Sequence, residues 1–254
     1  MIGLIIIIIV VLFGLKLYFN KQKRIRNFQM PADTKQLLLE HIVFYRNLDD
    51  EQKIVFETRI KDFLSHVSIT GVGTIVEDLD RILIASGAII VIFGFPDWRY
   101  NNISEILLYK DAFNEAYQQH GNDRTILGMV GDGALHRQMI LSQASVRESF
   151  QRQDDGHNTV IHEFVHLVDK ADGAADGIPE YLLSRPYLMP WIENMHKTID
   201  EMKNNKHPDI NFYGTKNDAE FFAVVSEYFF ERPEALKSNH PELYQLLEQM
   251  FRPL

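Results

Sequence analysis

Apolar positions in this chain repeat mostly with the period of a helix. Spacings of three and four residues predict helices at 34–45, from Asp49 to about 64, at 191–204 on the surface, and at 218–230 and 241–251. Residues 80–95 are apolar almost throughout. Because Ser86-Gly87 interrupts this run and it is short, we expect a buried core helix there rather than a membrane span.

A short β-rich segment stands between the helices. Runs at 103–109, 125–130 and 138–142 are separated by glycine turns and predict a small sheet. Asn158 is a suitable N-cap for the next helix, which we expect to end near Asp172-Gly173. Loops are expected at 174–187 and 208–214. The pattern therefore predicts an α+β fold, mainly helical with a small β-sheet, in one domain at 33–254.

The first 20 residues predict a transmembrane anchor. Residues 2–19 are apolar or glycine apart from Lys16, which approaches the roughly 20 residues that span a bilayer. A basic juxtamembrane linker at 21–32 follows. Since positive charges remain on the inner side, we expect a single-pass, membrane-anchored protein whose catalytic domain is cytoplasmic. A cleaved signal peptide or an interfacial segment is the alternative.

Composition narrows the chemistry. The formal net charge of −9 argues against a nucleic-acid binder, which would need a basic face. The chain has no cysteine, which excludes disulfides, thiolate zinc sites and cysteine nucleophiles. Any metal site must therefore use His, Asp or Glu ligands.

The sequence His162-Glu163-Phe164-Val165-His166 carries the clearest candidate chemistry. Residues four apart share a helix face, so His162 and His166 can bind one metal ion. Glu163 lies beside them, where its carboxylate can take a proton from water. The alternative is a purely structural role, in which the helix is buried and its histidines form hydrogen bonds.

A catalytic zinc usually has three protein ligands and one open position. Glu220 and Glu227 are the strongest downstream candidates, because a carboxylate in so apolar a helix is costly unless it is paired or binds metal. They lie two turns apart on one face, so one can be the ligand and the other can bond a ligand histidine. The other candidates, in polar surroundings, are Glu180, Glu193, His196 and His207.

The motif at 161–169, together with Tyr213 and the segment 219–230, resembles the Mlc titration factor A family of zinc-dependent peptidases. It is more distantly similar to the catalytic domain of anthrax lethal factor. The resemblance implies a zincin-like fold with Glu220 as a gluzincin-type third zinc ligand and Glu227 as support. It also implies that Tyr213 faces the metal, where its hydroxyl could donate to an oxyanion. The alternative for Tyr213 is packing at the domain edge.

The sequence does not decide the roles of two further residues. Asp169 could orient a ligand histidine or cap the end of the motif helix. The resemblance suggests a histidine upstream of the motif near the metal, and His120 is the candidate for it.

These observations predict a peptidase with one zinc ion per chain, in which zinc-activated water attacks the peptide and Glu163 is the general base. The resemblance implies aminopeptidase-type action on small substrates. It also implies an alternative, a catalytically weak regulatory protein that binds a transcription repressor or another protein partner. The membrane segment departs from the soluble founding member of that family.

Overall fold

A computed structural model describes residues 14, 16, 28–121, 123–131, 133–152 and 155–252. Its helices are α2 Thr34–His41, α3 Val43–Arg46, α4 Asp50–His66, α5 Asp78–Ile92, α6 Gln143–Gln151, α7 Thr159–Asp169, α8 Arg185–Lys203, α9 Asp218–Glu231, α10 Pro233–Asn239 and α11 Pro241–Phe251. The strands are β1 Ser68–Val72, β2 Glu105–Tyr109, β3 Gly128–Val130 and β4 Gln138–Ser142. Single 3₁₀ turns are η1 Gly133–Leu135, η2 Lys170–Asp172 and η3 Phe212–Thr215. The predicted α+β class is confirmed at this level.

The strands form one sheet in the order β1-β2-β4-β3. Strands β1, β2 and β4 are parallel to one another, while β3 runs antiparallel to β4 and forms an edge of the sheet. The three predicted β runs correspond to β2, β3 and β4. The pattern missed β1, because Gly71 inside Ser68–Val72 looked like a break between helices.

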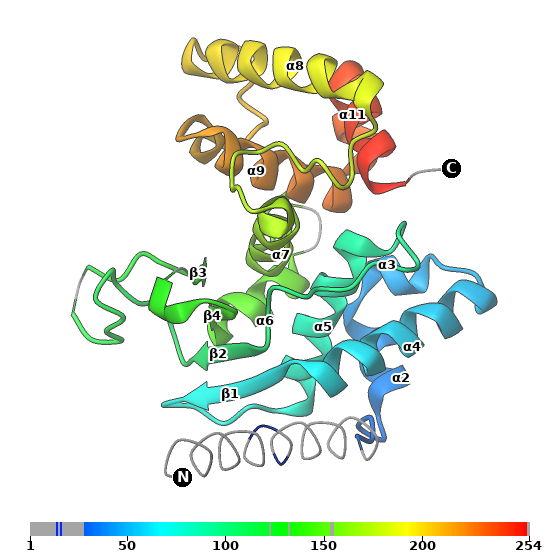
Figure 1. Ribbon diagram of the computed structural model, residues 1–254, viewed down its shortest axis with the longest axis vertical. Helices are drawn as coiled ribbons and strands as arrows, with labels where there is room; N and C mark the ends of the chain where they lie inside the picture. Colours follow the sequence, from blue (N-terminus) through cyan, green and yellow to red (C-terminus); the bar gives the residue numbers. More distant parts are fainter. Residues whose placement is uncertain are drawn as a thin grey trace, which may run out of the picture.

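Helix α7 lies at the centre of the molecule. Figure 1 shows it between the sheet on one side and the layer of α8, α9 and α11 on the other. It also packs against α5, the predicted core helix, in which twelve of the fifteen residues are buried. The ring of Phe164 on α7 meets Phe63 and Tyr100, with centroids 5.6 and 5.1 Å apart. The site-bearing helix is thus held from several directions.

Gly87 lets α5 and α7 approach closely. A Cβ at this position would lie 2.5 Å from Cγ1 of Val160, closer than real Cβ contacts come. The interruption that the sequence shows inside the apolar run is therefore a packing requirement. It sets the distance between the core helix and the helix that carries the histidines.

Helix α8 differs from the prediction of a loop to residue 187 and an exposed helix from 191. It begins at Arg185, with Pro186 in its first turn and Pro190 inside. Proline is compatible with a first turn because the N–H groups there have no intrahelical acceptor. The helix is also less exposed than expected, because the Trp191 ring is fully buried and its Nε1 donates to Gly177 O at 2.7 Å.

The predicted transmembrane anchor at 1–20 lies outside the described residues apart from positions 14 and 16, and the linker at 21–32 is described only at 28–32. Within the described ranges, no helix is long and apolar enough to cross a bilayer. This finding contradicts the expected location, a single-pass, membrane-anchored protein with a cytoplasmic catalytic domain. The most apolar of these helices, α5, has 15 residues, whereas a span needs roughly 20.

A Gly87→Ala variant tests the close packing of α5 on α7. Overpacking should lower the free energy of unfolding by about 1–3 kcal/mol, measured by urea denaturation. In a double-mutant cycle, Val160→Ala should partly relieve this loss because the smaller side chain makes room. Strictly additive effects of the two substitutions would contradict the contact.

Candidate metal centre

Helix α7 begins as the sequence predicts. Asn158 is its N-cap, and the Asn158 side chain accepts from the N–H of Ile161 at 3.0 Å. The apolar faces of the helix are buried, while His162 and His166 stand one turn apart on the side that faces α9, with ring centroids 4.7 Å apart. The helix therefore presents both imidazoles to one point.

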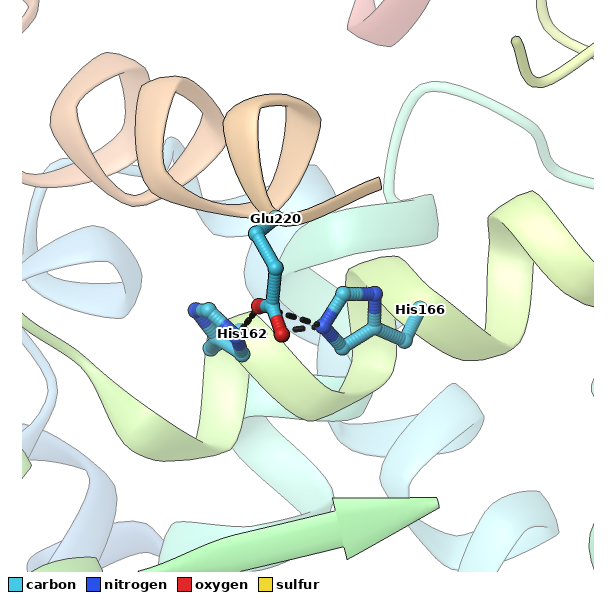
Figure 2. A group of neighbouring side chains, drawn as sticks. All are labelled: His162, His166 and Glu220. Carbon is cyan, nitrogen blue, oxygen red and sulfur yellow. Dashed lines mark hydrogen bonds and ion pairs between the residues drawn. The ribbon is translucent and has the colours of Figure 1, made fainter. Parts of the chain in front are cut away.

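Helix α9 supplies the third side chain. Asn217 caps it by accepting from the N–H of Glu220 at 2.8 Å, which places Glu220 in the first turn. Figure 2 shows its carboxylate reaching from α9 to the two imidazoles of α7. Glu220 Oε2 lies 3.0 Å from His162 Nε2 and 3.3 Å from His166 Nε2. Side chains 54 and 58 residues apart in sequence thus meet at one carboxylate oxygen.

The three ligand atoms fit a metal ion. The two Nε2 atoms are 3.1 Å apart, so the three atom pairs span 3.0–3.3 Å. In a tetrahedral zinc site with bonds of about 2.0–2.1 Å, neighbouring ligand atoms are roughly 3.3 Å apart. In the part of the chain that the structure describes, this is the one group of three such side chains close enough to hold an ion.

Glu227 orients His162. Its Oε1 lies 2.7 Å from His162 Nδ1, and its Oε2 accepts from the backbone N–H of Asn158 at 2.6 Å. Since a carboxylate can only accept, Nδ1 carries the proton, and Nε2 of the neutral ring offers a lone pair to the centre of the site. The residues alone did not decide which of Glu220 and Glu227 is the ligand and which supports a ligand histidine. The structure brings Glu220 to the histidine Nε2 atoms and Glu227 to the opposite ring nitrogen.

Lone pairs that converge in this way require a positive charge between them. Burial lowers the pKa of His162, but the hydrogen bonds with Glu220 and Glu227 outweigh burial and hold that pKa well above its usual value. Burial raises the pKa of Glu220, yet the contacts with His162 and His166 outweigh burial and keep that pKa well below its usual value. A proton or a metal ion can supply this charge, and the donor set of two imidazoles and a carboxylate suits zinc.

Glu163 is buried beside the histidines. Burial raises its pKa, while His162 and His166 oppose the rise. Its carboxylate lies against Gly128 of β3, where an added Cβ would be 2.7 Å from Glu163 Oε1. Glycine at this position leaves room for the carboxylate, a role that the sequence pattern did not reveal.

Tyr213 borders the site from η3. It is 48% exposed, and its hydroxyl donates to Glu220 Oε1 at 3.2 Å. Lys216 was not identified from the sequence, yet its Nζ donates to both Tyr213 Oη at 3.0 Å and Glu220 Oε1 at 3.2 Å. The only signal in the sequence was that Lys216 lies four residues before Glu220, a spacing at which two residues of one helix can pair. Asn217 obscured this signal, because it caps α9 and so places Lys216 before the helix.

The remaining candidates lie elsewhere or have other partners. Asp169 Oδ2 accepts from the N–H of Gly177 at 2.9 Å and so fixes the loop after the motif helix, while burial raises the pKa of Asp169 to about 7. Glu180 and Glu193 are exposed. His196 pairs with Asp218 and His207 with Glu201. His120 is exposed and does not belong to the metal-ligand group among the described residues.

Comparison with known proteins agrees with this arrangement. The family model described as glucose-regulated metallo-peptidase M90 matches residues 17–252. An uncharacterized protein of Synechocystis sp. is 30% identical over 243 residues, covering 91% of this chain and 87% of the relative.

Other relatives carry a functional name. Mlc titration factor A of Pectobacterium atrosepticum is 31% identical over 165 residues, which cover 58% of each chain. Mlc titration factor A of Serratia proteamaculans is 29% identical over 167 residues, with 60% of this chain and 61% of the relative covered. The match thus spans about three fifths of these two relatives. The likeness to anthrax lethal factor stays a prediction.

The roles of the two glutamates on α9 can be separated by metal analysis. Glu220→Ala removes one of three ligand atoms and should abolish stoichiometric zinc binding, whereas Glu227→Gln should retain zinc with an affinity roughly 10–100-fold lower. Exposed Glu193→Gln is the control and should hold one zinc per chain. Stoichiometric, tightly bound zinc in Glu220→Ala would assign the third ligand to another residue.

Proposed function

The chain belongs to the glucose-regulated metallo-peptidase M90 family, and from this membership we propose that it is a zinc-dependent peptidase. The observation that carries the proposal is the convergence of His162, His166 and Glu220 within 3.0–3.3 Å, with the buried carboxylate of Glu163 beside them. A purely structural metal site has no use for such a carboxylate. Aminopeptidase-type action on small substrates is part of the same proposal.

His162, His166 and Glu220 would hold the ion. When bound, zinc supplies Lewis acidity, which lowers the pKa of a water toward neutrality and polarises a peptide carbonyl. Glu163 accepts the proton of the attacking water and returns it to the leaving amine. Burial favours this role, because a carboxylate with a raised pKa is a stronger base.

Tyr213 is proposed to bind the developing oxyanion. Its hydroxyl already lies at the edge of the site, donating to Glu220 Oε1, and its ring centroid is 6.2 Å from that of His162. A half-exposed phenol can turn its O–H from Glu220 to a substrate oxygen when a peptide binds. Such a donor strengthens in the transition state, where the oxygen gains charge.

The open edge of β3 is proposed to bind the peptide backbone. Leu127 accepts a hydrogen bond from Ser142 of β4, and Gly131 donates one to Gln138. In the alternating antiparallel pattern, Gly128 and Val130 therefore turn their N–H and C=O groups away from β4. On that side the preceding residue, Ile126, is already paired with Phe113, so the edge available to a substrate begins after Ile126. A substrate can add there as another strand. Because Gly128 contacts Glu163, this strand would bring a peptide bond to the base.

The relatives named Mlc titration factor A favour a second candidate, a regulatory protein that binds a repressor. Here the metal centre would be dispensable for function. The two candidates differ in their response to Glu163→Gln, which removes the base but preserves the surface. The regulatory effect of this variant should be unchanged if the chain acts by binding a repressor, and lost if it acts by cleaving peptides.

Replacing the base should separate metal binding from turnover. Glu163→Gln should retain one zinc per chain and lower kcat for a fluorogenic peptide at least about 100-fold, because general-base catalysis contributes roughly 10²–10⁴. Exposed Glu180→Gln is the matched control. Cleavage by Glu163→Gln at the parent rate would refute the assignment of the base.

Gly128→Val should impair catalysis without removing the metal. The added Cβ would displace the Glu163 carboxylate, which lies 2.7 Å away, and we expect kcat/KM to fall roughly tenfold or more while zinc content is unchanged. Met129→Val, at the next position of the same strand, controls for the effect of valine on the sheet. Equal activity of both variants would exclude a role for Gly128 in placing Glu163.

A further inference from the structure

The two carboxylate oxygens of Glu220 face different surroundings. Oε2 faces Nε2 of His162 and of His166, at 3.0 and 3.3 Å. Oε1 accepts from Tyr213 Oη and from Lys216 Nζ, both at 3.2 Å. One oxygen is thus available to the centre of the site, and the other is occupied on its outer side.

The position of Lys216 is unusual for a surface charge. Lys216 ends η3 and precedes Asn217, the N-cap of α9, where the partial positive charge of a helix start disfavours a cation. Its side chain is 58% exposed, whereas that of Glu220 is 13% exposed. Its Nζ also lies 3.0 Å from Tyr213 Oη, so one ammonium group touches both the third ligand and the tyrosine. A solvated surface lysine would have no such pair of partners.

We propose that Lys216 is a positioning residue that restricts Glu220 to metal binding through Oε2 alone. This inference rests on the proposed metal centre. A carboxylate can bind a cation with one oxygen or with both. If Glu220 bound through both oxygens, the second would compete for the position that a catalytic site must leave open to water. Lys216 holds Oε1 away from that position, and Tyr213 contributes until its O–H turns to a substrate.

The arrangement carries a cost in metal affinity. An ammonium group near the ion repels it, and the carboxylate oxygen that Lys216 occupies is withheld from coordination. Removing the charge should therefore tighten metal binding and slow turnover. These opposite directions distinguish a positioning role from general support of the site, which would weaken both.

The test compares Lys216→Met, which keeps an unbranched side chain one atom shorter and removes the charge, with the conservative Lys216→Arg. Exposed Lys203→Met on α8 is the control. For Lys216→Met we expect zinc affinity, measured by competition with a chelator, to rise roughly threefold. We expect kcat to fall roughly tenfold with little change in KM. Lys216→Arg should keep the zinc affinity and kcat of the parent, and Lys203→Met should change neither.

The cobalt-substituted proteins give a readout that is independent of turnover. The visible absorption of Co²⁺ weakens when coordination rises from four to five, and Lys216→Met should show this weakening while the parent and Lys216→Arg do not. An unchanged spectrum and affinity in Lys216→Met would overturn the proposal. So would parallel losses of affinity and kcat. If the parent cleaves no peptide, the proposed function fails, yet the affinity and the spectrum still decide the role of Lys216.

Discussion

The bridge that Glu227 forms between α9 and the start of α7 is the interaction on which the candidate site depends. A carboxylate that is 5% exposed is costly unless it is well bonded, and Glu227 accepts two short hydrogen bonds, from the backbone of Asn158 and from Nδ1 of His162. One bond ties the first turn of α7 to α9. The other sets the tautomer and orientation of the His162 ring. The same side chain therefore joins the packing of two helices to the chemistry at their interface.

The network continues away from the candidate metal site. Asn158 also donates from Nδ2 to Glu231 Oε1 at 3.1 Å, and Glu231 Oε2 accepts from the N–H of Gly156 at 3.1 Å. Burial raises the pKa of Glu231 to about 8. Glu220, Glu227 and Glu231 thus lie along one helix with different environments: one at the histidine Nε2 atoms, one behind a histidine ring, and one at the loop before α7. An apolar helix tolerates these three glutamates because each has a partner on the neighbouring elements.

The sheet contributes to the site through its edge. β3 is short and antiparallel, and its Gly128 permits Glu163 to stand directly beside the strand. On the other side of α7, Gly87 permits the core helix to approach. Two glycines on different elements therefore determine how deeply α7 is set into the fold. Their lack of a side chain matters more here than their conformational freedom.

Local sequence determined much of this arrangement. The four-residue spacing of His162 and His166 places both on one face of any helix, Asn158 can cap that helix, and apolar periodicity requires α5, α7 and α9 to be buried. Only the tertiary structure decided which glutamate meets which imidazole nitrogen, since residues seven apart on α9 share a face and differ only in what lies opposite. It also revealed β1, Gly128 and Lys216, because pairing with a distant strand, room for a neighbouring carboxylate and a contact across a helix cap leave no periodic signal. Helical spacing is a property of the local chain, whereas the charges and distances that make a metal centre arise between segments that only packing brings together.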